Sequence, residues 1–303
     1  MLNDIKKLEI GKQQEIRFLI KSAESAKTRT GDVYQRLTVR DENDHETIVL
    51  NFKDKIEGNF PLVVNAMVDT SEYRESASVR MLSYTIDEKA KADRFLPKPA
   101  IDRKETLKAL SAKSQGIRMG LRKIVAEILN EHVTAFSTYP FSSSGLFARG
   151  SGILEASYKL TVLAEQTATA LGLDRDLMIA GAMLYYIGRT QTIDHAYNYT
   201  PDDVLLGNGM TAAMIVQAKV QEIRSGNDEK LKKSLDDTDI RLLEHILVSR
   251  FKGLPTAIPE ACALRHLDAI VTDTESIASI AEDSGHNTIV QDRNLFGNRV
   301  YVR

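Results

Sequence analysis

Residues 173–189 read LDRDLMIAGAMLYYIGR, and this stretch decides how the second half of the chain folds. Apolar residues fill its centre at nearly every position, which predicts a helix buried inside a larger helical assembly. An aspartate at its start, Asp174 or Asp176, can cap the first turn, and Gly188 can end the helix. A Tyr-Tyr pair stands just before that glycine, and a buried tyrosine needs a hydrogen-bond partner for its hydroxyl.

Helical spacing continues on both sides of this stretch, from residue 150 to about residue 283. Apolar residues three and four apart form a stripe over residues 160–171, and residues 258–283 predict a last long helix with Pro259 near its first turn. The tail over residues 284–303 has two strand-like patches around an Asn/Gly turn. We therefore predict an all-α bundle over residues 141–283, followed by a short tail.

The first 90 residues follow a different period. Five short runs of alternating apolar residues, separated by turn-rich segments such as DENDH (41–45), predict five β-strands. Five short strands in one segment of this length indicate a small barrel or sandwich. The chain is therefore expected to be an α+β multidomain protein, with an N-terminal β domain over residues 1–90.

Residues 91–140 join the two parts. The stretch LPKPA (96–100) interrupts the chain with two prolines, and amphipathic helical spacing follows it. This segment holds ten Lys or Arg against five Asp or Glu, whereas residues 1–90 hold fourteen against sixteen. The basic excess of the chain is thus concentrated in this linker and its helices.

Bulk composition limits the classes of function. The formal net charge is −2, so any affinity for nucleic acid must come from a local patch. Cys262 is the one cysteine, which excludes disulfide frameworks and cysteine-based zinc sites. The N-terminus lacks the apolar core of a signal peptide, and no apolar run approaches the roughly 18 residues of a membrane span. We expect a cytoplasmic protein with no membrane association.

Strand parity gives the first functional signal. In VYQRLTVR (33–40), Leu37 and Val39 share one face, and one tyrosine and two arginines share the other. Such a face can stack and hold single-stranded RNA or DNA, although the same alternation is also typical of an ordinary solvated strand. Parity places Phe52 inward, and it places Arg80 and Tyr84 on one face. The candidate nucleic-acid-binding residues are Tyr34, Arg36, Arg40, Lys53, Arg80 and Tyr84.

The helical half resembles the HD-domain superfamily of metal-dependent phosphohydrolases, and the whole chain resembles the YhaM-type 3′-5′ exoribonucleases. The phrases that carry this resemblance run nearly from end to end: LEIGKQQEIRFLIKSA, RFLPKPAIDRKETL, LDRDLMIAGAMLYYIGR, LLGNG, EHILVSR, PEACALRHLDAIVTD and DRNLFGNRVY. That family couples an N-terminal OB-fold to a C-terminal HD domain. The resemblance therefore implies an OB-fold barrel, a nucleic-acid substrate and a homo-oligomer.

The resemblance also implies that the metal ligands of the HD domain have been replaced. In the family, the segment matching LYYIGR reads Leu-His-Asp-Ile-Gly-Lys, and its His-Asp pair binds the catalytic metals. Tyrosine is a poor ligand for a divalent ion at neutral pH, and a two-metal site needs several carboxylates and imidazoles. The replaced positions are Ala156, Tyr185, Tyr186, Arg189, Asn208, Arg250 and Phe251. His245 and Asp268 are the two family-like positions that keep a ligand side chain.

These observations favour a nucleic-acid-binding protein without metal-dependent hydrolysis and without a cofactor. Asp268, freed from a metal, is an expected acceptor for one of the tyrosines, with Arg189 or Arg250 to neutralise it. Those arginines can also hold phosphate, or simply pair with local acids. Two alternatives stay open. One is an active phosphodiesterase or 3′-5′ exonuclease with a remodelled metal site, using a cation such as manganese on His245, Asp268 and His266. The other is a helical docking protein in a homo-oligomer.

Overall fold

The structure of the protein, a computed structural model, describes residues 1–28, 30–57, 60–73, 76–87, 90, 92–143, 145–194, 197–250, 253–282, 286–291 and 299–303. The chain divides into two compact units, Met1–Lys98 and Pro99–Arg303. The division falls inside LPKPA, where two prolines interrupt regular structure. Each unit has a hydrophobic core of its own.

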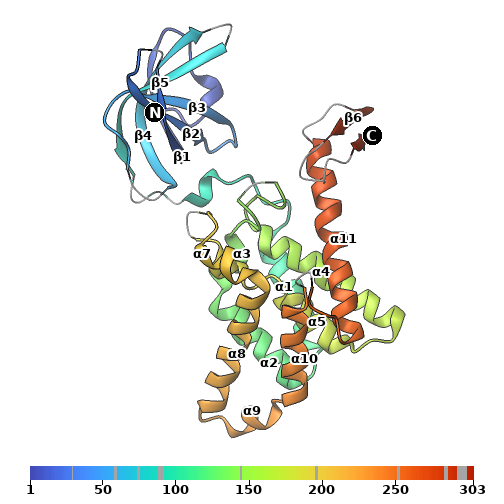
Figure 1. Cartoon of the computed structure of the whole chain (residues 1–303). Coiled ribbons are helices and arrows are strands. Elements are labelled where there is room, and N and C mark those ends of the chain that lie inside the picture. The colour runs from blue at the N-terminus through green and yellow to red at the C-terminus, as the bar shows by residue number, and fades with distance from the viewer. Residues whose placement is uncertain are drawn as a thin grey trace. The chain divides into compact units, whose positions relative to one another are not determined.

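The first unit is a closed barrel of five strands, as the sequence predicted. The strands are β1 (Gln13–Lys27), β2 (Val33–Arg40), β3 (Glu46–Asn51), β4 (Leu62–Tyr73) and β5 (Ser76–Ile86), with short 3-10 helices at Ile5–Lys7 and Ala92–Phe95. Their order around the barrel is β1-β2-β3-β5-β4, and β4 pairs with β1 to close it (Figure 1). The β3–β5 pair is parallel and the other pairs are antiparallel. This closed five-stranded barrel fits the OB-fold.

The second unit is helical, also as predicted. Its helices are α1 (Arg103–Gln115), α2 (Met119–Glu131), α3 (Val133–Thr138), α4 (Gly152–Leu171), α5 (Arg175–Leu184), α6 (Arg189–Thr192), α7 (Pro201–Leu205), α8 (Gly207–Ser225), α9 (Glu229–Ser234), α10 (Asp237–Val248) and α11 (Pro259–Glu282). A hairpin of β6 (Thr288–Gln291) and β7 (Arg299–Val302) follows α11 (Figure 1). No helix among the described residues is long and apolar enough to cross a membrane.

Helix α5 is the central element of the helical core. Every residue from Leu177 to Leu184 is buried, and α5 contacts α1, α2, α4, α10 and α11. Asp174 caps it, because its side chain accepts a hydrogen bond from the Leu177 amide at 3.0 Å. The helix ends at Leu184, four residues before the glycine that the sequence suggested as its end. The Tyr-Tyr pair therefore lies in the turn that follows α5.

Gly188 has a packing role in that turn. Its φ of −58° is one that any residue can adopt, so the left-handed conformation typical of a helix-ending glycine is absent. A Cβ at this position would lie 2.1 Å from the backbone oxygen of Asn208. Only glycine lets the turn approach the start of α8 so closely. This contact brings the Tyr-Tyr turn against the first residues of α8.

Candidate functional site

The outer face of the barrel carries an aromatic stack with an arginine on it. The rings of Tyr34 and Phe52 are stacked, with centroids 4.9 Å apart and planes 15° from parallel. The guanidinium of Arg80 lies 5.0 Å from the centre of the Phe52 ring. Leu50 lies between two arginines, since it pairs with Arg36 on β2 and with Arg80 on β5. The result is an aromatic and apolar strip with cations beside it.

Phe52 belongs to this strip because the parity expected for β3 was wrong. Phe52 and Ile48 are exposed, whereas Asn51 points into the barrel. The buried Asn51 is satisfied there, since its amide donates to Gln35 Oε1 at 3.1 Å and to the Asp54 backbone oxygen at 3.0 Å. Gln35 in turn exchanges two hydrogen bonds with the Ile56 backbone. This closed polar network lets β3 present its apolar side chains outward.

The other barrel candidates have different fates. Arg36 and Lys53 are exposed, and Arg40 is held by two acids, since its Nε donates to Glu46 at 2.7 Å and lies 3.5 Å from Asp44. Parity predicted that Tyr84 and Arg80 share one face of β5, and this prediction was wrong. A bulge shifts the β4–β5 register between Met67 and Val68. The bulge turns Tyr84 toward the barrel core, against which it packs.

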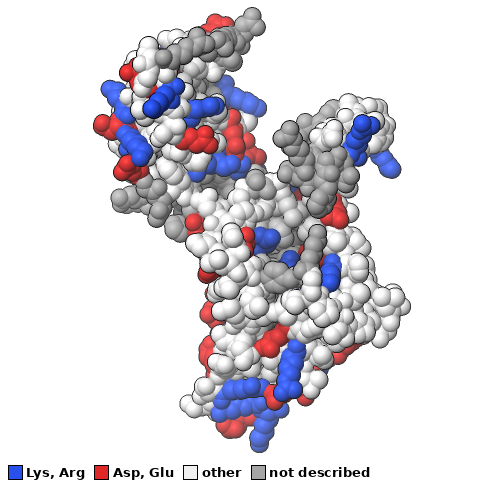
Figure 2. Space-filling view, in the orientation of Figure 1, with Lys and Arg blue, Asp and Glu red and all other residues white. Residues whose placement is uncertain are grey.

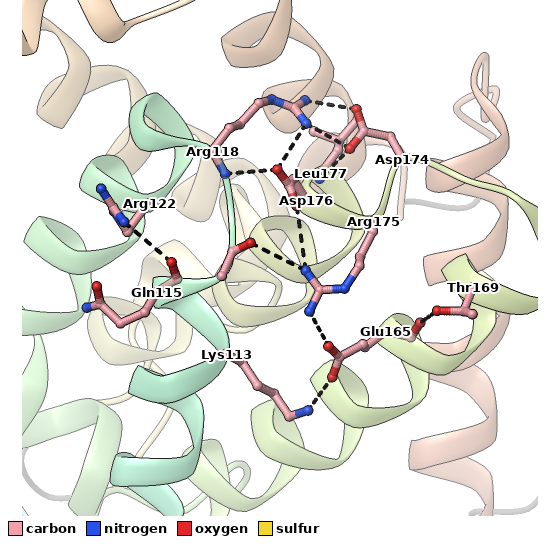
Figure 3. A network of polar contacts seen from close by, with 11 residues as sticks. Lys113, Gln115, Arg118, Arg122, Glu165, Thr169, Asp174, Arg175, Asp176 and Leu177 are labelled. Carbon is pink, nitrogen blue, oxygen red and sulfur yellow. Dashed lines mark hydrogen bonds and ion pairs between the residues drawn. The ribbon is translucent and has the colours of Figure 1, made fainter.

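Several cations of the basic linker helices are held in ion pairs. Arg118 donates to both oxygens of Asp174 at 2.8 and 2.9 Å and also to Asp239, and these acids raise its pKa above the ordinary value (Figure 3). Lys113 pairs with Glu165 in the same network (Figure 3). On the face of the barrel drawn in Figure 2, blue and red side chains are interspersed. Part of the basic excess is thus neutralised within the helical unit, whereas Arg94, Lys98 and Lys104 are exposed.

The Tyr-Tyr turn forms the polar centre of the helical unit. Tyr185 and Tyr186 are both buried, and their rings meet edge to face at 5.4 Å. The Tyr186 hydroxyl donates to Asp268 Oδ1 on α11 at 2.6 Å. The Tyr185 hydroxyl is buried and has no hydrogen-bond partner among the described residues. Asp268 is therefore the acceptor that the sequence suggested, and it serves one tyrosine of the pair.

Arg250 joins this centre from the end of α10. Its Nη1 donates to the Tyr185 backbone oxygen at 2.8 Å, and its Nη2 lies 3.5 Å from Asp268 Oδ2. Its guanidinium also lies 4.4 Å from the centre of the Tyr185 ring. The Asn208 side chain donates to the same Tyr185 oxygen at 3.2 Å. A carbonyl at the end of a helix lacks an intrahelical partner, so Arg250 and Asn208 together satisfy the end of α5.

Burial sets the protonation of the tyrosines. Burial raises the pKa of Tyr186 well above its ordinary value, and the charge of Asp268 raises it further. Burial also raises the pKa of Tyr185, against an opposing effect of Arg250. Both phenols therefore stay protonated at neutral pH, which leaves Tyr186 as the donor to Asp268.

Arg189 lies beside this centre and forms no ion pair with an acid among the described residues. Its guanidinium carbon is 3.9 Å from the centre of the Phe141 ring, and Phe141 meets the Tyr186 ring edge to face at 4.8 Å. Its Nε and Nη1 atoms are buried and have no hydrogen-bond partner among the described residues. Burial lowers the pKa of this guanidinium, and the charge of Arg250 lowers it further.

The remaining candidates do not join the centre. Ala156 is buried on α4, and His245 uses its Nε2 to accept a hydrogen bond from the Ala257 amide at 3.0 Å. His266 is exposed, and Phe251 lies outside the described residues. The remodelled ligand set of His245, Asp268 and His266 does not gather among the residues that the structure describes.

The donor chemistry of this centre does not fit a pair of divalent cations. One oxygen of Asp268 accepts from Tyr186, and the other faces Arg250. The neighbouring phenols are protonated, and the guanidiniums of Arg189 and Arg250 would repel a cation. Within the described ranges, the one group of three metal-type ligands lies on the barrel, at Asp4, Asp41 and His45. There the two Asp41 oxygens already accept from the backbone amides of residues 5, 43 and 45.

Phe52 and Phe141 are the two site residues that the sequence did not indicate. Phe52 continues the alternation of Ile48 and Leu50, whose apolar character predicted the inward face, whereas Ile48 and Phe52 are exposed. Phe141 lies outside every helix, and it meets Arg189 through a loop contact across 48 residues of chain. Neither position carries a local signal, since each depends on contacts between segments that are distant in the sequence.

Comparison with known proteins supports the resemblance seen in the sequence. The chain is similar to the 3′-5′ exoribonuclease YhaM of Bacillus licheniformis, with 22% identity over 276 residues that cover 86% of this chain and 85% of the relative. Coverage of this extent includes residues of both units. The expected resemblance is confirmed, and a barrel followed by a helical unit fits the arrangement of OB-fold and HD domain. No family model and no solved structure matches the chain.

Proposed function

We propose that this protein binds single-stranded nucleic acid, RNA in particular, on the outer face of its barrel and does not hydrolyse it through a two-metal mechanism. The name of its relative, an exoribonuclease, supports RNA as the ligand. The barrel face supports binding, since stacked aromatic rings with an adjacent arginine are how OB-folds hold unpaired bases. The binding residues are Tyr34, Phe52 and Arg80, with Arg36 and Lys53 beside them.

The single observation that carries the absence of hydrolysis is the hydrogen bonding of Asp268. The centre offers one carboxylate, which accepts from Tyr186 and faces the Arg250 guanidinium, whereas a pair of metal ions needs several anionic or imidazole ligands. We infer that the helical unit is an HD domain in which packing and ion pairing have replaced metal ligation. The positions involved are Ala156, Tyr185, Tyr186, Arg189, Asn208, His245, Arg250 and Asp268.

The test is a filter-binding titration of a single-stranded oligoribonucleotide at about 50 and about 200 mM salt. We expect affinity to fall as salt rises, because phosphate contacts release counterions. A single-stranded deoxyribonucleotide of the same sequence, in the same titration, reports the preference between RNA and DNA. Absence of binding at the lower salt concentration would contradict the proposal.

The second candidate function is that of an active 3′-5′ exonuclease. Its support is the similarity to an exoribonuclease along most of the chain. Two measurements on the same sample separate this function from non-hydrolytic binding. They are metal analysis of the purified protein and a nuclease assay with added manganese. Stoichiometric bound manganese together with trimming that a chelator abolishes would replace our proposal with this one.

We also infer self-association through the start of α8. Apolar side chains are exposed there and at the end of α7, with Val204 85% and Leu205 77% accessible. A shallow groove between α8 and α10 continues this surface, lined by residues such as Ala213, Met214 and Val248. Light scattering tests the inference, and Leu205→Glu should shift the mass toward the monomer. We also propose that the protein is cytoplasmic.

A further inference from the structure

The unpartnered guanidinium of Arg189 requires an explanation. An arginine stays charged in proteins, even where burial lowers its pKa. Its Nε and Nη1 are out of contact with solvent, and no described residue accepts a hydrogen bond from them. Leaving the buried donors of a charged group without acceptors destabilises the folded state. The Phe141 ring, 3.9 Å away, offsets only part of this through its π face.

The acids near Arg189 do not supply the missing acceptor. Asp203 and Tyr199 raise the pKa of Arg189 through charge, but less than burial and Arg250 lower it. No ion pair within 4.0 Å joins Arg189 to Asp203 or to another acid among the described residues. Asp268 faces Tyr186 and Arg250 instead. Arg189 therefore contributes a positive charge that no described acid pairs with directly.

Arg250 adds a second guanidinium whose hydrogen bonds are incomplete. Its Nη1 is committed to the Tyr185 oxygen, but its Nη2 makes a long contact of 3.5 Å to Asp268. The two arginines repel each other. An anion near both would relieve this repulsion and supply the missing acceptors. The side chains of Arg250 and Asp268 keep 15% and 20% of their exposure, so this centre reaches the surface of the helical unit.

We propose that Arg189 and Arg250 form a phosphate-binding site in the helical unit. A phosphate group offers several acceptor oxygens and negative charge in the tetrahedral arrangement that guanidinium groups hold best. Arg189 binds the anion directly, and Arg250 stabilises it by charge and through Nη2. The ligand is a phosphate monoester, either free phosphate or the terminal phosphate of an oligonucleotide. Only the second of these rests on the proposed function.

The experiment measures the Tm of the full-length protein with inorganic phosphate, at constant ionic strength set by chloride. A ligand that binds only the folded state raises Tm, and saturating phosphate should raise it by about 2–6 °C. In Arg189→Met, we expect the Tm without phosphate to equal or exceed that of wild type, because an unpaired buried charge is removed. The rise with phosphate should disappear in this variant.

Arg122→Met is the matched control. It removes an arginine of the same unit that donates a 3.4 Å hydrogen bond to the Gln115 backbone oxygen (Figure 3). This variant should keep the full response to phosphate. An equal phosphate response in wild type and Arg189→Met would overturn the site. If Arg189→Met fails to fold, calorimetric titration of wild type with phosphate decides: no saturable heat overturns the proposal, and saturable heat weakened at least fivefold by Arg250→Lys supports it.

Two oligoribonucleotides distinguish the sources of the phosphate. One carries a 3′-phosphate and the other a 3′-hydroxyl, and each competes against inorganic phosphate in the calorimeter. Stronger competition by the 3′-phosphate form assigns the site to a strand end, and equal competition assigns it to free phosphate. Phe52→Ala separates this site from the barrel, since it should weaken oligonucleotide binding and leave the response to inorganic phosphate unchanged.

Discussion

The barrel face and the helical centre each hold an arginine over an aromatic ring, but the two pairs serve different roles. On the barrel, Arg80 lies over the ring of Phe52, a residue that is 39% exposed. In the helical unit, Arg250 lies over Tyr185, and the ring is buried with Asp268 nearby. An open ring can accept a stacked base, whereas a buried ring can only pack. The exposure of the ring decides whether the ring of an arginine–aromatic pair can accept a stacked base or only packs within the fold.

The strongest test of this contrast removes the carboxylate of the helical centre. Asp268→Ala leaves the Tyr186 hydroxyl and Arg250 Nη2 without their acceptor. We expect the free energy of unfolding to fall by about 3 kcal/mol, as measured by chemical denaturation. Asp273→Ala removes an exposed acid of the same helix and should change stability by less than about 0.5 kcal/mol. Equal effects of the two substitutions would remove the structural role assigned to Asp268.

The second test removes one of the two stacked rings on the barrel. Phe52→Ala should weaken binding of a single-stranded oligoribonucleotide by about 2 kcal/mol, or roughly 30-fold, because one stacking platform is lost. Tyr84→Phe is its control, since Tyr84 packs against the barrel core and should leave affinity unchanged. Both dissociation constants come from filter binding. Unchanged binding in Phe52→Ala would place the nucleic-acid surface elsewhere.

The two tyrosines provide a paired comparison inside the helical centre. Tyr186→Phe removes a hydroxyl that donates to a carboxylate, so we expect a loss of about 1.5–2 kcal/mol in unfolding free energy. Tyr185→Phe removes a buried hydroxyl without a partner and should be neutral or stabilising. Thermal and chemical unfolding of the two variants measure the difference. The reverse order would show that Tyr185 carries the important hydrogen bond.

Alkaline pH should distinguish the same two hydroxyls from ordinary phenols. The pKa of Tyr186 is raised in the folded state, so folding favours its protonated form. Its contribution to stability is therefore complete below the unfolded pKa of about 10 and is lost as pH rises further. Above about pH 10, wild type should lose stability more steeply than Tyr186→Phe, by up to about 1.4 kcal/mol per pH unit. Parallel curves would contradict this assignment.

The sequence predicted the architecture because hydrophobic period is a local property. Alternation gave the five strands, helical spacing gave the second unit, and Asp174 marked the start of α5. The bond between Tyr186 and Asp268 joins residues 82 positions apart. Chemistry suggested Asp268 as the acceptor, but only the packed structure selects one tyrosine over its neighbour.

The failures have one physical cause in common. Tyr84 turns inward because of a bulge, and Phe52 turns outward because Asn51 finds polar partners inside the barrel. In both strands, a contact with a neighbouring element overrides the alternation of a single strand. The sequence likewise could not predict that Arg189 Nε and Nη1 have no hydrogen-bond acceptor among the described residues, because no sequence pattern reports such an absence. Phe52 and Arg189 are also the positions from which the functional proposals arise.

The smallest expected effect concerns the arginine of the barrel stack. Arg80→Gln removes a cation over Phe52 and should weaken oligoribonucleotide binding by about 0.5–1 kcal/mol, or roughly two- to fivefold. If Arg80 also contacts a phosphate, the slope of log affinity against log salt should become shallower by about 0.7. Arg40→Gln is the matched control, because Glu46 and Asp44 already hold Arg40. A larger effect at Arg40 than at Arg80 would place the nucleic-acid contact away from the exposed Phe52 ring, and ring exposure would then no longer separate the barrel from the helical centre.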